Sequence, residues 1–328
     1  MEPDHKRTPT ELRRLARRHV VADPECCRFS LAYRPPYDWD AMLAFLRARA
    51  TPGVESVEAR HYRRTIQIDG KNGVIDVSHM ASGSALGLEV RFPDPRALLF
   101  IVERVRRVFD LGADPAVIGA QLRADPLLRR PLTKHPGIRT PGAWDEFELA
   151  VRAILGQQIS VRAATTLAGR IATVFGSPAT DGRGLARDPR NELDRLFPTP
   201  AQLENAAVER AGVMPARADT IRSLARHVGK GTIAFNSCVD GRASVSALKA
   251  LPGIGDWTAE YIAMRALGEP DAFPSGDRVL RRVAGDCTAH ELARKSEAWR
   301  PWRAYAVMLL WQGATDDARS QEDDTGAT

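Results

Sequence analysis

The spacing of the apolar residues changes once along the chain, near residue 110, and this change limits the fold more than any other feature. Before it, apolar and polar residues alternate, which predicts half-buried antiparallel strands. After it, apolar residues recur at helical spacing, which predicts amphipathic helices. Strands are expected at residues 65–68, 74–77 and 86–92, with a turn at residues 69–73. The chain is therefore expected to have an α+β fold, in which an N-terminal antiparallel sheet domain with helices precedes an all-α region.

Capping residues and turn composition divide the chain further. Asp38, Asp94 and Ser160 each precede an apolar helical stretch and are expected to be N-caps. Helices are expected at residues 39–50, 95–108, 147–155, 161–171, 200–206, 216–228, 244–250, 256–267, 278–283 and 302–311, with a surface loop at 180–189. The predicted segments are an N-terminal extension (1–25), an α+β domain (26–112), an all-α region (113–315) and a disordered acidic tail (316–328).

The charge of the chain is uneven. The 47 basic and 41 acidic residues give a net charge of +6, and residues 316–328 contribute −4, so residues 1–315 carry +10. A basic body favours a nucleic-acid partner. Arginine-rich usage also follows from a GC-rich genome, so charge alone does not decide the function.

Composition excludes two classes of protein. The longest apolar runs, residues 97–102 and 306–311, have six residues each, whereas a membrane-spanning helix needs about 20. No apolar signal follows the charged first residues, so a cytoplasmic location is expected. The four cysteines lack the spacing of a zinc site, an iron–sulfur cluster or a disulfide framework, so no metal is expected.

A glycine-bracketed turn, with the sequence LPGIG at residues 251–255, separates two predicted helices. Several backbone N–H groups meet in such a turn at the positive end of the second helix dipole, and this geometry binds phosphate. Glycines also simply end helices, so the turn by itself is a weak indication of DNA binding.

An acidic residue and several aromatic residues follow the turn. Trp257 and Tyr261 lie four positions apart and share one helix face, and Trp311 ends the last predicted helix. Rings at such positions are also ordinary core residues. Asp277 directly precedes a predicted helix, where an N-cap role is favoured. A capped carboxylate is rigid and ionised, which also suits it to stabilise a developing positive charge.

Four separated motifs, in this order, resemble the helix-hairpin-helix DNA glycosylases and, more narrowly, bacterial 3-methyladenine DNA glycosylase II. They are YRPPYDW with MLAF within residues 33–45, VRAILGQQIS at 151–160, LPGIGDWTA at 251–259 with Asp277 downstream, and PWRAYA at 301–306 with Trp311. The resemblance extends over residues 28–312, nearly the whole chain.

The resemblance implies a role for each matching residue. Asp277 corresponds to the family's catalytic aspartate, and Gln157 to a polar position beside the flipped nucleotide. The base pocket is expected to be lined by Trp257, Tyr261, Trp311, Phe45 and Gln157. DNA is expected to contact Gly253, Ile254, Gly255, Gln158 and Arg278.

Two residues depart from the family pattern. Gln158 stands where the family has an apolar residue that wedges into the DNA stack, and Arg278 stands where an aromatic residue follows the catalytic aspartate. Both departures concern base flipping and substrate range more than reaction type. The cysteines of the iron–sulfur members are absent, and no cofactor is expected apart from a monovalent cation at the hairpin carbonyls.

The sequence therefore predicts a base excision repair glycosylase. It would flip alkylated purines, such as 3-methyladenine and 7-methylguanine, out of double-stranded DNA and hydrolyse the N-glycosidic bond. A strand-cutting enzyme would need a lysine where this chain has Trp257, and Lys249 and Lys295 lie elsewhere. The alternative is a non-catalytic DNA-binding or regulatory protein, which would need neither Asp277 nor an aromatic pocket. The sequence leaves open which base is preferred and whether neutral bases such as hypoxanthine are accepted.

The N-terminal extension carries a second, shorter resemblance. Residues 7–14 resemble the last helix of arabinose-regulator-type helix-turn-helix domains. This match leads us to expect a larger fusion with a regulatory or methyltransferase domain. Independently of it, the chain is expected to act as a monomer. The α+β domain has no role that the sequence assigns.

Overall fold

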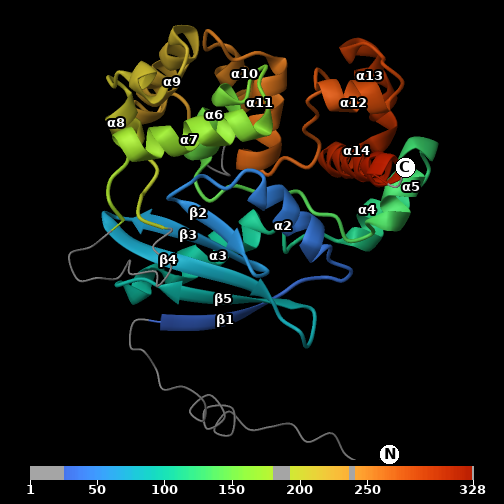
Figure 1. The fold of residues 1–328 in the computed structure, drawn as a ribbon, viewed down its shortest axis with the longest axis horizontal. Helices are drawn as coiled ribbons and strands as arrows, with labels where there is room; N and C mark the ends of the chain where they lie inside the picture. Colours follow the sequence, from blue (N-terminus) through green and yellow to red (C-terminus); the bar gives the residue numbers. More distant parts are fainter. Residues whose placement is uncertain (1–25, 180–192, 236–240, 327–328) are drawn as a thin grey trace, which may run out of the picture.

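The N-terminal part of this computed structural model is a five-stranded antiparallel sheet (Figure 1). The structure describes residues 26–179, 193–235 and 241–326, so the extension 1–25 and the predicted loop 180–189 lie outside the described residues. The strands are β1 (Cys26–Ala32), β2 (Glu55–Glu58), β3 (His61–Ile68), β4 (Lys71–His79) and β5 (Ala85–Arg91), in the order β1-β5-β4-β3-β2. This sheet and the helical region beyond it confirm the predicted α+β fold class.

The turn between β3 and β4 is shorter than predicted. Ile68 pairs with Lys71, so the turn consists of Asp69 and Gly70 alone, with φ angles of 49° and 74°. Two consecutive positive φ angles define a type I′ turn, which Asp-Gly adopts readily and whose twist matches the strands. Residues 71–73, predicted as turn, therefore belong to β4.

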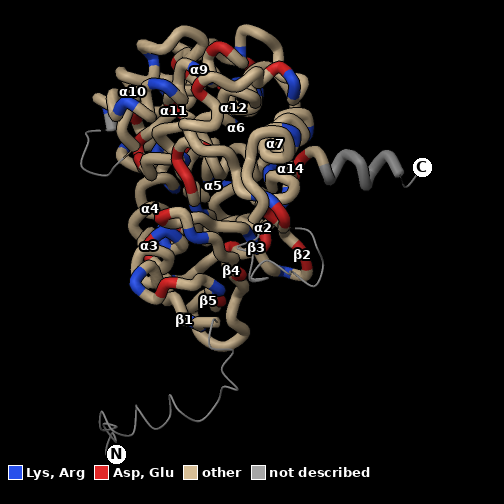
Figure 2. Tube along the Cα trace, turned by 90° about the vertical axis from the view of Figure 1, so that its left-hand side faces the viewer, with Lys and Arg blue, Asp and Glu red and all other residues tan. Residues whose placement is uncertain are grey.

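Two helices, α2 (Trp39–Arg47) and α3 (Leu98–Val108), pack against the apolar side of the sheet. Asp38 Oδ1 accepts the Ala41 N–H at 2.9 Å and caps α2 as predicted. Large side chains of this core include Trp39, Tyr62, Ile66, Ile75, Leu86, Leu88, Phe92, Ile101, Phe109 and Trp144. Figures 1 and 2 both place α2 between the sheet and the helical region, so α2 can contribute residues to both.

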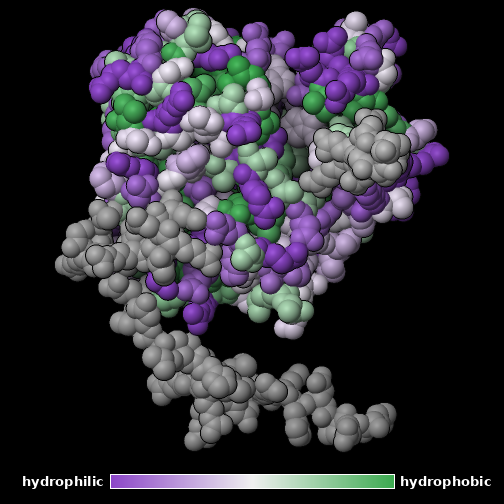
Figure 3. Space-filling view, in the orientation of Figure 1, coloured by the Kyte–Doolittle hydropathy of each residue, from purple (hydrophilic) through white to green (hydrophobic). Residues whose placement is uncertain are grey.

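The remaining helices form two lobes with separate cores. The first lobe contains α6 (Glu146–Leu155), α7 (Val161–Phe175), α8 (Pro200–Leu203), α9 (Pro215–Gly229), α10 (Gly241–Lys249) and α11 (Asp256–Ile262). The second lobe contains α4 (Pro115–Leu122), α5 (Pro126–Lys134), α12 (Arg278–Val283), α13 (Ala289–Lys295) and α14 (Arg303–Gly326). Figure 3 shows the surface hollowed between the two lobes. None of the described helices is long and apolar enough to cross a membrane.

Helix α14 corrects one sequence prediction. It continues to Gly326, through most of the acidic segment predicted to be disordered. Asp316 lies 2.7 Å from Lys134 Nζ and 2.9 Å from His135 Nε2, because the end of α5 packs against α14. The amino-acid composition shows that this segment has an excess of acidic residues. It does not show that the end of α5 supplies Lys134 and His135 as their basic partners.

Candidate active site

The predicted hairpin joins α10 to α11, and its conformation is fixed from within the first lobe. Gly253 has a φ of +89°, and a Cβ there would lie 2.1 Å from Thr220 Oγ1, so only glycine fits. Its carbonyl accepts a hydrogen bond of 2.8 Å from Gln157 Nε2, and Ile254 is buried in the core. Gly255 is exposed, and a Cβ there would meet nothing within 4 Å. The hairpin thus presents Gly255 and Asp256, the first residue of α11, to solvent.

The open space at Gly255 allows the hairpin to be tested as a DNA contact. We expect Gly255→Val to weaken binding to damaged and undamaged duplexes alike, by about tenfold, because phosphate contacts carry no information about the bases. Its φ of −89° is accessible to valine, so the free energy of unfolding should change by no more than about 1 kcal/mol. Fluorescence anisotropy with both duplexes measures the effect.

Gly229→Val is the matched control for this variant. Gly229 also faces open space, at the end of α9 remote from the hairpin, so its replacement should leave duplex affinity unchanged. Unchanged affinity of the Gly255→Val protein, or a loss confined to damaged DNA, would contradict phosphate binding by the hairpin.

Asp277 is the N-cap of α12, and its carboxylate accepts four hydrogen bonds. Oδ1 accepts the backbone N–H groups of Val279 and Leu280 at 2.9 and 3.0 Å. The indole N–H of Trp311 donates to Oδ1 and that of Trp257 to Oδ2, both at 3.1 Å. Oδ1 is therefore occupied by the cap, whereas Oδ2 has a single donor among the described residues. The capping role leaves Oδ2 with capacity for a ligand.

The predicted pocket aromatics form one continuous row beside Asp277. Trp257 and Tyr261 stack with ring centroids 5.4 Å apart and an interplanar angle of 14°. Tyr261 and Trp311 follow at 6.3 Å, and Phe45 and Trp311 lie 6.4 Å apart at 22°. All four side chains are half-buried. Because Phe45 comes from α2, the N-terminal domain completes a row that α11 and α14 begin.

Two arginines that the sequence analysis missed lie against the same rings. The guanidinium carbons of Arg49 and Arg265 are 3.7 and 4.7 Å from the Phe45 ring centroid. Arg265 Nη1 also donates to the Tyr261 hydroxyl at 2.9 Å. Burial lowers the pKa of both guanidinium groups. Burial also acts to raise the pKa of the Tyr261 hydroxyl, but Arg265 and Arg49 outweigh it and lower that pKa.

Three predicted site residues belong neither to this row, nor to the hairpin turn, nor to the Asp277 cap. The Gln157 amide donates to the Gly253 carbonyl and to Thr258 Oγ1, at 2.8 and 2.9 Å, and so supports the hairpin. Gln158 is exposed with a φ of +58°, and Arg278 is exposed at the first position of α12. The structure thus places the carboxylate and the aromatic rings together, and leaves Gln158 and Arg278 on the surface.

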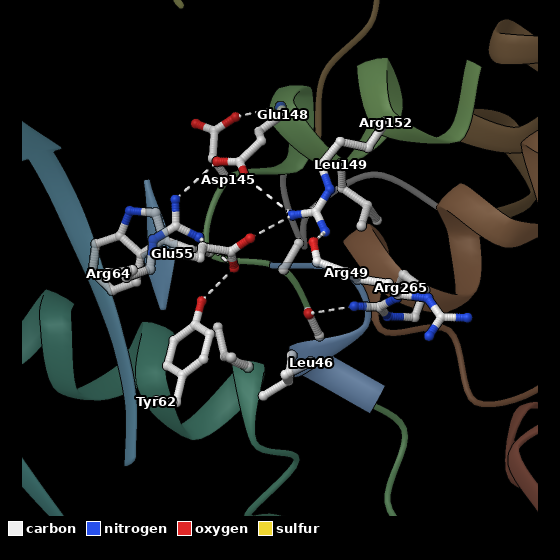
Figure 4. A pocket seen from close by; sticks show the side chains of 14 residues that line it. Leu46, Arg49, Glu55, Tyr62, Arg64, Asp145, Glu148, Leu149, Arg152 and Arg265 are labelled. Atoms are coloured by element: carbon white, nitrogen blue, oxygen red, sulfur yellow. Dashed lines mark hydrogen bonds and ion pairs between the residues drawn. The ribbon is translucent and has the colours of Figure 1, made fainter. Parts of the chain in front are cut away.

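A small cavity lies beside the two arginines (Figure 4). Its volume is about 20 Å³, which is room for about one water molecule and far too little for a base. Charged side chains dominate its wall, namely Arg49, Glu55, Arg64, Asp145, Glu148, Arg152 and Arg265. The cavity therefore belongs to the support beneath the aromatic row. Within the described ranges, no group of three or more His, Cys, Asp or Glu residues is placed to hold a metal ion.

A comparison with known proteins decides the family. DNA-3-methyladenine glycosylase 2 of Escherichia coli is 32% identical over 286 residues, which cover 86% of this chain and 96% of that protein. The chain belongs to the DNA-3-methyladenine glycosylase 2 family. The family predicted from the four sequence motifs is thereby confirmed.

Further similarities agree with this glycosylase family. The family model described as the AlkA N-terminal domain matches residues 28–145. The probable bifunctional transcriptional activator/DNA repair enzyme AlkA of Mycobacterium tuberculosis is 38% identical over 311 residues, and the chain covers 61% of the length of that relative. The solved 3-methyladenine DNA-glycosylase from Archaeoglobus fulgidus has a TM-score of 0.74 at 22% identity, over 88% of this chain and 98% of that chain. This last likeness shows the shared fold alone.

Proposed function

We propose that this member of the glycosylase family hydrolyses the N-glycosidic bond of alkylated purines in double-stranded DNA and stops at the abasic site. The observation that carries the proposal is a carboxylate, Asp277, bound by two indole N–H groups beside a row of four aromatic rings. A non-catalytic DNA-binding protein would need neither feature. The name of the E. coli relative, DNA-3-methyladenine glycosylase 2, supports the same substrate class.

The aromatic row suits a base that has left the duplex. A base inside the stack cannot be reached at its glycosidic bond, so its nucleotide must first rotate outward, at a cost of a few kcal/mol. The rings of Phe45 and Trp311 are nearly parallel, with centroids 6.4 Å apart, and a flipped planar base can stack on exposed ring faces of this row at about 3.5–4 Å. A cationic alkylated purine would gain about 0.5–2 kcal/mol from the ring faces.

The position of Asp277 suits the bond-breaking step. As the base departs, the sugar develops oxocarbenium character, and the carboxylate stabilises this positive charge electrostatically. Water then bonds to the anomeric carbon, and Asp277 Oδ2 can accept its proton because only the Trp257 indole N–H donates to that oxygen among the described residues. A cationic base leaves as a neutral molecule, so the reaction needs no general acid and we propose no cofactor.

The test of this function is release of a free base without strand cleavage. We expect the protein to liberate 7-methylguanine from a methylated duplex, detected by chromatography, and to give no covalent adduct when borohydride is present during turnover. A Schiff base needs a free amine in the first turn after the hairpin, where Trp257 stands. The Lys249 ammonium, on the preceding helix, pairs with Asp256.

The two outcomes of this test are separable. Failure to release any methylated base from duplex DNA would overturn the glycosylase assignment. A borohydride-dependent adduct that disappears on replacing one lysine would instead leave the glycosylase assignment intact and overturn only its monofunctional character.

Three finer expectations about partners accompany the proposal. We propose that the protein acts as a monomer on damaged DNA in the cytoplasm. The name of the mycobacterial relative, a bifunctional activator and repair enzyme, supports the expectation of fusion with a regulatory domain.

The hairpin carbonyls of Pro252 and Gly253 accept hydrogen bonds from Thr220 and Gln157, and each keeps a second lone pair for a monovalent cation.

A further inference from the structure

The two arginines beside the aromatic row hold their charges without a direct ion pair among the described residues, although the Asp277 carboxylate acts on Arg49 from a longer distance. Among the described residues, neither Arg49 nor Arg265 makes an ion pair with a carboxylate. Arg152 of the same cluster, by contrast, lies 2.8 Å from Glu55 and 3.2 Å from Glu148. A guanidinium stays protonated in proteins, so the base pocket has a fixed positive charge in poorly hydrated surroundings.

The two guanidinium groups differ in how fully they are bound. Arg265 donates to the carbonyls of Pro141 and Gly142 and to the Tyr261 hydroxyl, so its hydrogen-bonding capacity is directed into the protein. Arg49 lies 3.7 Å over the Phe45 ring and makes a long bond of 3.3 Å to the Phe45 carbonyl. Arg49 is also bonded to Tyr261, and Asp277 is among the charges that act on it. Arg49 is therefore the cation with capacity left for a ligand beside the catalytic carboxylate.

The charge of the damaged base decides what such a cation does. When the bond between the anomeric carbon and N9 breaks, its electron pair passes to the base. An N-alkylated cationic purine becomes neutral, whereas a neutral purine becomes an anion that later takes a proton from water. A fixed guanidinium in a poorly hydrated pocket stabilises that anion and opposes the binding of a cation.

We propose that Arg49 contacts the flipped base and stabilises the negative charge that develops on a neutral leaving base, so that it sets the relative excision of neutral and cationic lesions. The inference rests on the proposed function and names a residue of this chain that would discriminate between leaving bases by their charge. Asp277 acts on the sugar in both cases, so Arg49 affects the choice between lesions rather than the reaction type.

The experiment compares two lesions within each protein. Single-turnover release of hypoxanthine, which is neutral, and of 7-methylguanine, which is cationic, is measured from otherwise identical duplexes. We expect Arg49→Gln to lower the ratio of the hypoxanthine rate to the 7-methylguanine rate by about tenfold or more. Arg49→Lys, which keeps the charge, should retain most of the ratio. Using the ratio cancels any general loss from altered packing against Phe45.

Arg47→Gln is the matched control, because Arg47 is exposed at the end of α2, two positions before Arg49, and its hydrogen bond among the described residues is to the Val57 carbonyl. Its ratio should equal that of the wild type. Equal losses on both lesions in the Arg49→Gln protein, or an unchanged ratio, would overturn the role of Arg49. Wild-type protein that releases 7-methylguanine and no hypoxanthine would also overturn it, whereas release of neither base would overturn the proposed function itself.

Discussion

The Asp277→Asn protein is expected to fold and to bind duplex DNA, and to release methylated bases about 10²-fold or more slowly than the wild type. Asparagine is as good an N-cap as aspartate, so its side-chain oxygen can keep the bonds to the Val279 and Leu280 N–H groups. What disappears is the negative charge beside the sugar. An amide NH₂ in place of Oδ2 would also oppose the Trp257 indole N–H, donor against donor. Single-turnover chromatography of released base measures the loss.

Asp114→Asn provides the matched control for this variant. Asp114 caps α4 in the same manner, accepting the N–H groups of Ala116 and Val117 at 3.0 and 3.3 Å. Its replacement should leave base release unchanged. A folded Asp277→Asn protein that releases base near the wild-type rate would reduce Asp277 to a helix cap and would remove the main support for the proposed function.

Part of the site could be predicted because it is local in sequence. Trp257 and Tyr261 share a helix face at a spacing of four, and their rings do stack. Asp277 precedes a helix, and it does cap that helix. Phe45 entered the prediction only through the family resemblance, and Trp311 was noted beforehand only as an aromatic residue at the end of a predicted helix, since no periodicity indicates that α2 and α14 meet across the site. Their catalytic and pocket roles stay predictions.

The arginines of the site escaped the prediction for the same reason. Arg49 follows Phe45 by four positions and Arg265 follows Tyr261 by four, a spacing that favours one helix face for each pair, although Arg49 lies two residues beyond the end of α2. That signal was available, but arginines are abundant in this chain and most lie at the surface. Only the tertiary structure, which brings Arg265 against the Phe45 ring of α2, reveals that the two arginines lie against one ring.

The fold followed from hydrophobic periodicity, and the errors lie where periodicity carries no information. The alternation at residues 86–92 placed β5 within a residue, because one face of the sheet is buried. The β3–β4 turn was set too long, because Asp69 and Gly70 alone supply the required positive φ angles. Helices α4, α5 and α13 were not predicted, since they are short and depend on the core of the second lobe.

A buried ion network joins the sheet domain to the first lobe beneath the aromatic row. Arg64 on β3 lies 2.8 Å from Glu148 on α6 and 3.6 Å from Glu55, and all three side chains are at most 6% exposed. Burial acts to raise the pKa of Glu55, but Arg152 and Arg64 outweigh it and lower the pKa to about 2. The Glu55 carboxylate thus stays ionised inside the protein. Removing any one charged partner of the network would therefore leave a buried charge uncompensated.

We therefore expect Arg64→Met to lower the free energy of unfolding by about 3–5 kcal/mol, because it leaves two buried carboxylates to share Arg152. Urea denaturation measures this loss, and adding Glu148→Gln to the same protein should recover part of it, since the second change removes the uncompensated charge.

Arg28→Met is the control, because Arg28 and Glu89 form an ion pair of 3.2 Å on the same sheet with side chains 65% and 31% exposed. Exposed pairs contribute at most about 1 kcal/mol, so this change should have little effect. Equal losses for Arg64→Met and Arg28→Met would mean that the buried network does not hold the domains together. Since Arg152 also donates to the Arg49 carbonyl, the same network holds the turn that follows α2, and its loss should slow base release as well as destabilise the fold.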